Sequence, residues 1–208
     1  MTRSRAPRPA RSSSSQESAA SAGKSMPNRL RIIGGRWRGI SITFPPVAAL
    51  RPSPDRVRET LFNWLQPLIV DARCLDLFAG SGALGIEALS RGASHVAFVE
   101  SEPRVARYLE ETLQRLDASQ AEIHRVDALK YLDGASQPFD IVFLDPPYAS
   151  GLLQEVCDKL AARGWLAPQA CIYLESAADQ PLPALPAGWS VHRAKRAGQV
   201  GYHLLRSP

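Results

Sequence analysis

The chain has 208 residues, of which 45% are hydrophobic and 22% are charged, so it can bury the core of one domain with a short extension. No apolar run reaches the length of about 18 residues that a membrane-spanning helix needs, and no apolar segment follows the basic N-terminus as in a secretory signal. The first 75 residues hold thirteen basic and four acidic side chains, whereas the rest is net acidic; this asymmetry is typical of proteins with a polyanionic partner, although a solvated basic surface gives the same counts.

Residues 1–28 form a basic leader rich in serine, alanine, arginine and proline, without periodic hydrophobic residues. Such a composition cannot offset the entropy lost on ordering, so we expect this segment to be disordered. An organelle-targeting peptide is the alternative, but Pro7 and Pro9 would break the amphipathic helix that this alternative needs.

Residues 29–68 are predicted to form an extension made of a hairpin and a helix. Two short runs rich in β-branched residues flank a turn of glycines and arginines within residues 29–44, which is typical of a hairpin. Ser53 is expected to cap a helix whose first residue is Pro54. An apolar stripe at helical spacing supports this helix, and its members are Val57, Leu61, Phe62, Trp64 and Leu65.

Residues 69–208 carry the pattern of an α/β domain. From residue 73, apolar runs alternate with helical segments, which predicts a Rossmann-like, doubly wound and mostly parallel sheet. The last two runs follow each other without a helix, so we expect an antiparallel C-terminal hairpin at one edge of the sheet. The expected strands cover residues 73–78, 95–100, 121–126, 139–144, 169–175, 189–194 and 199–206, and the expected helices cover residues 83–91, 103–116, 127–132 and 151–163.

The three cysteines, Cys74, Cys157 and Cys171, are far apart and lack the spacing of metal ligands, and the four histidines are scattered as well. We therefore expect no metal site. Cysteines in apolar surroundings are expected to be buried, reduced thiols, as in a cytoplasmic protein.

A glycine-rich motif joins the first strand of this domain to the next helix, at residues 76–85 (DLFAGSGALG). Gly80 and Gly82 allow a tight turn and the close approach of a ligand, and the amides at the start of the helix can receive a negatively charged group. Together with Gly85 they match the G-x-G-x-x-G pattern. This pattern is shared by sites for NAD, FAD and S-adenosylmethionine, and a tight turn without a ligand also fits it.

Two acidic residues follow the next two strands. Glu100 ends an apolar run, where a carboxylate can accept hydrogen bonds from the hydroxyl groups of a bound ribose. Asp127 ends the following strand, where it can accept a hydrogen bond from an adenine amino group or simply cap the next helix. These residues favour a nucleoside cofactor without naming it.

The fourth motif decides between the cofactors. Residues 139–148 (FDIVFLDPPY) place Asp145, Pro146, Pro147 and Tyr148 directly after an apolar strand. Because ligands of open α/β sheets bind beyond the carboxyl ends of the strands, Asp145 and the glycine turn should meet at one rim. A stiff loop with a carboxylate, carbonyl oxygens and an aromatic ring can hold a planar amino group.

Together these motifs resemble class I methyltransferases that act on amino groups. Residues 31–39 (RIIGGRWRG) and 51–65 (RPSPDRVRETLFNWL) make the chain similar to bacterial small-subunit ribosomal RNA guanine-N2 methyltransferases of the RsmD type, from about residue 30 to about residue 206. The resemblance implies S-adenosylmethionine as cofactor, and ribosomal RNA within an assembled or assembling small subunit as partner. The implied cofactor-binding residues are Asp76, Phe78, Gly80, Ser81, Gly82, Gly85, Glu100, Ser101, Asp127 and Ala128.

The resemblance also assigns the remaining roles. Asp145, Pro146, Pro147 and Tyr148 are the expected catalytic residues, and the basic extension is expected to face RNA. The expected RNA-binding residues are Arg31, Arg36, Arg38, Arg51, Arg56 and Arg58. The alternative for Arg56 and Arg58 is pairing with Asp55 and Glu59 on a helix face. Three alternatives stay open: an NAD-dependent oxidoreductase, a DNA adenine-N6 or cytosine-N4 amino-methyltransferase, and a non-catalytic ribosome-assembly factor on the same fold.

Overall fold

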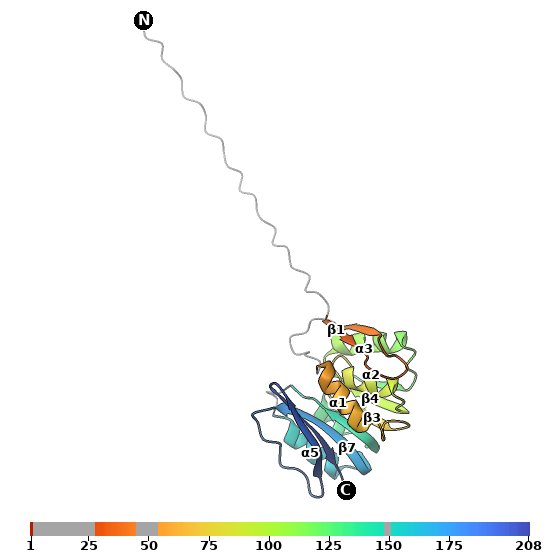
Figure 1. Cartoon of the computed structure of the whole chain (residues 1–208), viewed down its shortest axis with the longest axis vertical. Helices are drawn as coiled ribbons and strands as arrows, with labels where there is room; N and C mark the ends of the chain where they lie inside the picture. The colour runs from red at the N-terminus through yellow and green to blue at the C-terminus, as the bar shows by residue number, and fades with distance from the viewer. Residues whose placement is uncertain (2–27, 45–53, 148–150) are drawn as a thin grey trace.

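A computed structural model describes residues 1, 28–44, 54–147 and 151–208 of the chain (Figure 1). Most of the leader 1–28 therefore lies outside the described residues, as do Arg51, Ser53 and Tyr148, and the predictions for the leader, Arg51 and Tyr148 stay predictions. Within the described part, no helix has both the length and the apolar character needed to cross a bilayer.

A seven-stranded sheet forms the centre of the main domain, in the order β5-β4-β3-β6-β7-β9-β8. Strands β3 to β7 run parallel, and β9 lies antiparallel between β7 and β8. The predicted mostly parallel sheet with an antiparallel C-terminal edge hairpin is thus confirmed. The strands are β3 (Arg73–Asp76), β4 (His95–Val99), β5 (Ala121–His124), β6 (Phe139–Leu144), β7 (Leu166–Ala177), β8 (Ser190–Ala197) and β9 (Val200–Arg206).

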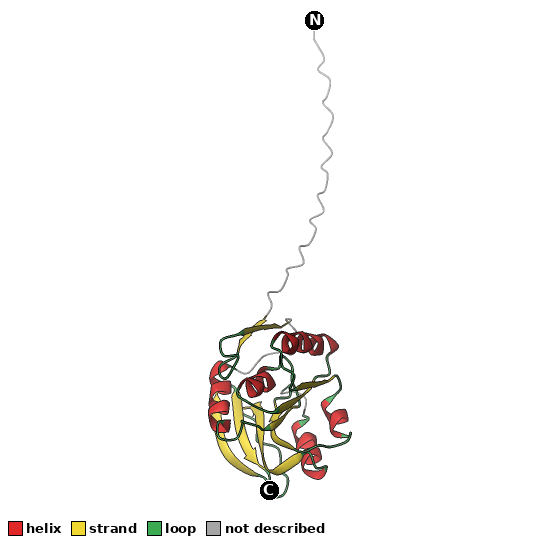
Figure 2. Ribbon diagram, turned by 90° about the vertical axis from the view of Figure 1, so that its right-hand side faces the viewer, coloured by secondary structure: helices red, strands yellow, loops and turns green. Residues whose placement is uncertain are grey.

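Helices cover both faces of this sheet (Figure 2). Alternate residues of the strands point to opposite faces, so Phe143 and Tyr173 join one apolar core while Leu144 and Leu174 join the other. The first core is completed by α1 (Asp55–Leu65), α2 (Ala83–Ser90) and α3 (Pro103–Arg115), and the second by α4 (Ala128–Leu132) and α5 (Leu153–Ala162). This double covering explains why the central strands are apolar throughout.

Two boundaries differ from the expected ones. Strand β7 begins at Leu166, three residues early, because Leu166 pairs with Phe139 before the register shifts and the backbone of Gln169 turns to a φ of 60°. Helix α1 begins at Asp55, so Pro54 occupies the N-cap position with extended backbone and is not the first helical residue. The prediction that Ser53 is the N-cap of this helix is therefore wrong. The fixed φ of proline suits either position, which is why the sequence pattern misplaced it by one residue.

The N-terminal hairpin of β1 (Asn28–Arg31) and β2 (Ser41–Phe44) is antiparallel and shares the first core with the sheet. Its turn is fastened to helix α2 by buried polar contacts. The carboxylate of Glu87 accepts hydrogen bonds from the amides of Ile33 (2.8 Å) and Gly34 (2.7 Å). Gly35 has a φ of 74°, and a side chain there would meet the Ser90 carbonyl oxygen, 1.7 Å from the position of a Cβ atom. The extension is therefore packed directly onto the helix that follows the glycine motif.

Candidate active site

The glycine motif forms the turn from β3 to α2. Asp76 ends β3, and its carboxylate accepts a 2.9 Å hydrogen bond from the amide of Gly85 in the first turn of α2. Gly82 has a φ of 77°, a conformation that favours glycine, and a Cβ atom at Gly85 would lie 2.2 Å from the Phe98 ring. Gly82 is thus required for the turn and Gly85 for the close packing of helix against sheet, as in nucleotide-binding folds.

Asp76 is an unusual carboxylic acid. Its side chain is fully enclosed by protein, and this burial raises the pKa of Asp76 to about 7. The hydrogen bond from the Gly85 amide opposes this rise, while the negative charge of Glu100 adds to it. A cationic group of a ligand beside Asp76 would favour its ionised form and lower this pKa.

Glu100 follows β4 and lies beside the same turn. One oxygen of its carboxylate accepts a hydrogen bond from the amide of Gly80 at 2.8 Å, and the other accepts one from the amide of Glu102 at 2.7 Å. Both contacts fix the carboxylate at the rim of the sheet, while Ser101 between them is exposed. The site fits a nucleoside, because each carboxylate oxygen has a further lone pair that can accept a hydrogen bond from a ribose hydroxyl beside these amides.

Asp127 acts as the cap of α4. Its carboxylate accepts hydrogen bonds from the amides of Leu129 at 2.9 Å and Lys130 at 3.3 Å. The capping role considered for this residue is confirmed, and a contact with adenine remains a prediction. The side chain is exposed and Ala128 behind it is buried, so capping still leaves Asp127 at the surface where a ligand can reach it.

The Asp-Pro-Pro segment begins directly after β6. Strand β6 pairs with β3 so that Asp76 lies opposite Phe143, and the amide of Leu77 donates a 3.2 Å hydrogen bond to the carbonyl of Phe143. Asp145, two residues later, therefore lies at the rim where β3 opens the glycine turn. Asp145 is half-buried, Pro146 is buried and Pro147 is exposed.

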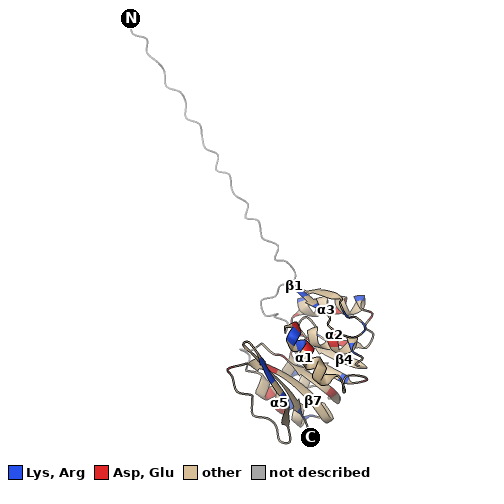
Figure 3. Cartoon of the chain, viewed as in Figure 1, with Lys and Arg blue, Asp and Glu red and all other residues tan. Residues whose placement is uncertain are grey.

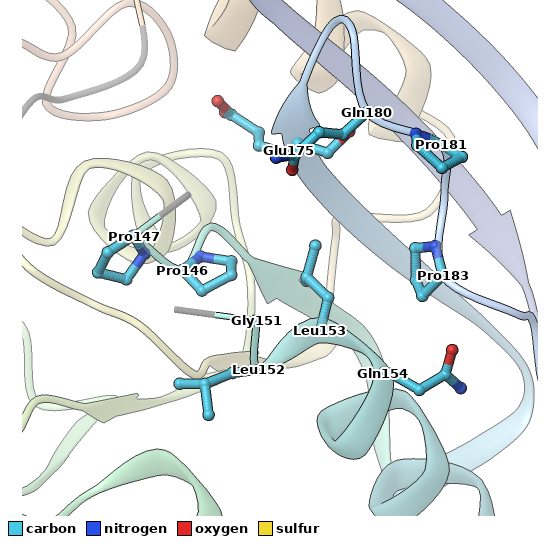
Figure 4. Close-up of a pocket in the computed structure, with 11 residues that line it drawn as sticks. Pro146, Pro147, Gly151, Leu152, Leu153, Gln154, Glu175, Gln180, Pro181 and Pro183 are labelled. Atoms are coloured by element: carbon cyan, nitrogen blue, oxygen red, sulfur yellow. The ribbon is translucent and has the colours of Figure 1, made fainter. Parts of the chain in front are cut away.

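A pocket adjoins this segment (Figure 4). Pro146 and Pro147 line one side of it, and Gln180, Pro181 and Pro183 line the other, while Glu175 at the end of β7 contributes a buried carboxylate. The hydroxyl of Tyr173 donates a 2.6 Å hydrogen bond to Glu175. Our reading of the sequence missed Glu175 and the segment 180–183. The sequence signal that could have indicated Glu175 is an acidic residue at the end of an otherwise apolar strand.

The arginines of the extension fall into two groups. Arg31, Arg36, Arg38 and Arg56 are exposed, and the blue segments of the hairpin and of α1 in Figure 3 mark basic residues on this side of the molecule. The side chain of Arg36 also lies over the Trp37 ring, 4.3 Å from its centroid. The exposed four are placed where a polyanion can reach them.

Arg58 does not belong to this surface, and its assignment to RNA contact is wrong. Its side chain has no exposed surface and donates hydrogen bonds to Asp55 at 2.7 Å and to the carbonyl of Arg31 at 2.9 Å. It also lies 3.6 Å from the buried Glu87 carboxylate. Position 58 faces inward because it lies on the buried side of α1, next to Val57 and Leu61. The alternative, in which Arg58 pairs with a neighbouring acid on the helix, is confirmed.

The cysteines are confirmed as buried and unpaired thiols. Among the described residues, no group of three or more histidine, cysteine, aspartate or glutamate side chains is arranged to hold a metal ion.

Comparison with known proteins agrees with this geometry. A family model described as Conserved hypothetical protein 95 matches residues 30–206. The chain belongs to this family. One curated relative is Ribosomal RNA small subunit methyltransferase D of Escherichia coli K12, which is 51% identical over 86% of this chain and 90% of its own length. The protein of the same name from Haemophilus influenzae is 45% identical over 86% of this chain and 94% of its own length.

The fold is also similar to that of a solved structure. The solved structure of the Escherichia coli protein yhhF is 49% identical, covers 86% of this chain and 98% of its own, and has a TM-score of 0.82. The resemblance to methyltransferases of the RsmD type, stated from the sequence, is therefore confirmed. The family's fold accounts for the position of both motifs at one rim of the sheet.

Proposed function

We propose that this protein transfers a methyl group from S-adenosylmethionine to the exocyclic N2 of a guanine in small-subunit (16S) ribosomal RNA. The observation that carries the proposal is the pairing of β6 with β3, because it brings Asp145-Pro146-Pro147 beside the glycine turn of α2. Membership of the family supports the choice of ribosomal RNA, since curated relatives covering most of this chain bear that activity in their names.

The donor side of the site is formed by Asp76, the glycine turn and Glu100. Glu100 is expected to accept hydrogen bonds from ribose hydroxyls, and Asp76 to attract the amino group at the other end of the cofactor. Phe78 and Ser81 flank the turn, and Ser101, Asp127 and Ala128 border the expected adenine position. When bound, S-adenosylmethionine supplies an electrophilic methyl group on a positively charged sulfur.

The acceptor side is formed by the Asp-Pro-Pro-Tyr segment. The N2 of guanine is a poor nucleophile because its lone pair is delocalised into the ring. Asp145 and the carbonyl of Pro146 are expected to accept the two hydrogens of N2, which holds the nitrogen partly pyramidal and directs its lone pair. Asp145 also stabilises the positive charge that grows on the nitrogen, and the proton leaves late through Asp145 to water.

Tyr148 and Pro147 are expected to hold the ring of the base. An aromatic side chain stacked on a base is worth about 1–3 kcal/mol. A base within a helical stem must leave its stack to reach this pocket, whereas a base in a loop is already accessible.

Phosphate contacts are assigned to the exposed arginines Arg31, Arg36, Arg38 and Arg56, together with Arg51, which lies outside the described residues. Such contacts position the RNA without reading its sequence, and they weaken as salt rises. The substrate is expected to be an assembled or assembling small subunit in the cytoplasm.

Transfer of a labelled methyl group tests the proposal. The protein is incubated with labelled S-adenosylmethionine and, in separate reactions, with small-subunit RNA, assembled small subunits and DNA, followed by mass analysis of the nucleosides. The proposal expects N2-methylguanosine in RNA or subunits and nothing in DNA. Methylated adenine or cytosine in DNA would identify the amino-methyltransferase alternative, and no transfer to any substrate would favour the assembly factor.

A further inference from the structure

We propose that strand β8 forms a second RNA-binding surface, on which Arg193, Lys195 and Arg196 contact phosphates of the nucleotides that flank the target base. This inference rests on the proposed function, because it assumes that an RNA base enters the site beside Asp145. It adds a surface at the opposite end of the chain from the N-terminal extension.

The register of the sheet connects β8 to the reaction site. Continued by one residue, the parallel pairing of β6 and β7 places Asp145 beside Glu175. Glu175 pairs with Tyr202 of β9, and Tyr202 pairs with Lys195 of β8. These four residues form one row across the sheet and point to the same face. Three strand spacings of about 4.8 Å separate Asp145 from Lys195, which is roughly 14 Å. That distance suits a neighbouring nucleotide rather than the target base itself.

Contacts on this face join β8 to the N-terminal extension. The ring of Trp64 on α1 stacks on Tyr202 with centroids 5.6 Å apart, and the ammonium group of Lys195 lies 6.0 Å from the centre of the Trp64 ring. The first turn of α1 carries the exposed Arg56. Arg193 and Lys195, which pair with Leu204 and Tyr202, therefore share this face with α1, whereas Arg196, one residue further, points to the opposite face. The C-terminal hairpin lies next to α1 in Figure 1.

The charge of β8 is uncompensated. The strand contains three basic residues and no acidic one, and Arg193, Lys195 and Arg196 are all exposed. None of the ion pairs formed among the described residues includes any of the three. Exposed cations without acidic partners attract phosphates and release counterions when they bind them.

Two adjoining hollows lie between Pro146 and Arg196 at the edge of the sheet. Ser176 and Gln180 line both the pocket beside the Asp-Pro-Pro segment and a second hollow, which Lys195 and Arg196 line as well. An RNA strand that places its base near Asp145 can thus continue over Ser176 and Gln180 onto β8. Charged residues on an edge strand also prevent pairing with another sheet, so the test must separate this role from RNA contact.

The test compares two triple variants of the full chain. One carries Arg193→Gln, Lys195→Gln and Arg196→Gln, and the matched control carries Arg107→Gln, Arg115→Gln and Arg163→Gln, which removes the same charge from exposed positions on α3 and after α5. Binding to small-subunit RNA is measured over a range of salt concentrations. Each phosphate contact contributes about 0.7 to the slope of log K against log salt, so the β8 variant should lose about 2 in slope and up to roughly 50-fold in affinity at 0.15 M salt.

The remaining measurements exclude other causes. Affinity for S-adenosylhomocysteine should be unchanged in both variants, and a variant with Arg193→Lys and Arg196→Lys should keep the wild-type slope because the charge is preserved. The inference is overturned if the β8 variant binds RNA like the control. It is also overturned if the variant forms oligomers while its monomer keeps the RNA affinity of the control, because the charges would then only prevent pairing with another sheet. It is also overturned if binding falls on assembled subunits but not on RNA, which would indicate a ribosomal protein as the partner. Failure of the proposed function is distinct, because the wild-type protein itself would then produce no N2-methylguanosine.

Discussion

The amide of Gly80 donates a 2.8 Å hydrogen bond to the carboxylate of Glu100. This contact joins the turn before α2 to the end of β4, twenty residues further along the chain. The carboxylate is thereby held at the rim before any ligand arrives, so little orientation remains to be lost on binding. The two residues form the most direct link between the glycine motif and the expected ribose site.

Replacing Glu100 with alanine should weaken cofactor binding. A hydrogen bond to a charged group contributes about 1.5–3 kcal/mol, so affinity for S-adenosylhomocysteine should fall roughly 10- to 100-fold. Isothermal titration calorimetry measures this, with Glu111→Ala on α3 as the control. Unchanged affinity in the Glu100 variant would rule out a ribose contact at this position.

Asp76 should make stability depend on pH. Its pKa is about 7 in the folded protein, raised by burial from the ordinary value of 3.8. The folded state therefore holds this proton more tightly than the unfolded chain does, and the contribution of Asp76 to stability falls as pH rises from about 4 to about 7. Asn at this position keeps an acceptor for the Gly85 amide and removes the titration.

Thermal unfolding of wild type and Asp76→Asn without cofactor checks this prediction. The melting temperature of the variant relative to wild type should rise between pH 5 and pH 8, while its affinity for the cofactor should be lower at pH 8. A difference in melting temperature that stays constant over this range would contradict the raised pKa.

Arg56 and Arg58 should respond differently to the same substitution. Breaking a buried ion pair costs about 3–5 kcal/mol when a buried charge loses its partner. Because Glu87 keeps a second partner, Arg91 at 2.7 Å, we expect the lower end of this range for Arg58. Arg58→Gln should therefore lower the free energy of unfolding by an amount of this order and leave the salt dependence of RNA binding unchanged. Arg56→Gln should leave stability within about 0.5 kcal/mol, as is usual for surface changes, and reduce the salt slope by about 0.7.

Chemical denaturation and RNA binding at several salt concentrations separate the two variants. If Arg58→Gln kept full stability and lost RNA affinity, Arg58 would be an RNA contact and not a structural residue.

Much of the fold could be predicted because the strands of the main domain are apolar and the turns between elements carry glycine or proline. The place of Asp145 followed from β6 alone, since ligands of such sheets bind beyond the strand ends. Arg58 could not be placed correctly, because its charge indicated a surface position and only the packing of α1 against Glu87 turns it inward. Glu175 was missed for a related reason. Glu175 lies close to Asp145 because β6 pairs with β7, and the order of the strands along the chain does not specify this pairing.

The hydrogen bonds between the turn of the N-terminal hairpin and Glu87 of α2 could not be predicted either. Glu87 lies within a helix and Gly34 within a distant turn, and no local pattern connects them. Such contacts between residues far apart in sequence become visible only once the elements are packed.

Methyl transfer by Asp145→Ala tests the central claim most directly. Losing a group that stabilises charge in the transition state typically costs about 10²–10³ in kcat, so transfer to guanine N2 should fall by at least that factor. Affinity for S-adenosylhomocysteine should stay near the wild-type value, and Asp158→Asn on the exposed side of α5 should remain fully active. An Asp145→Ala protein that methylates guanine at the wild-type rate would contradict the account.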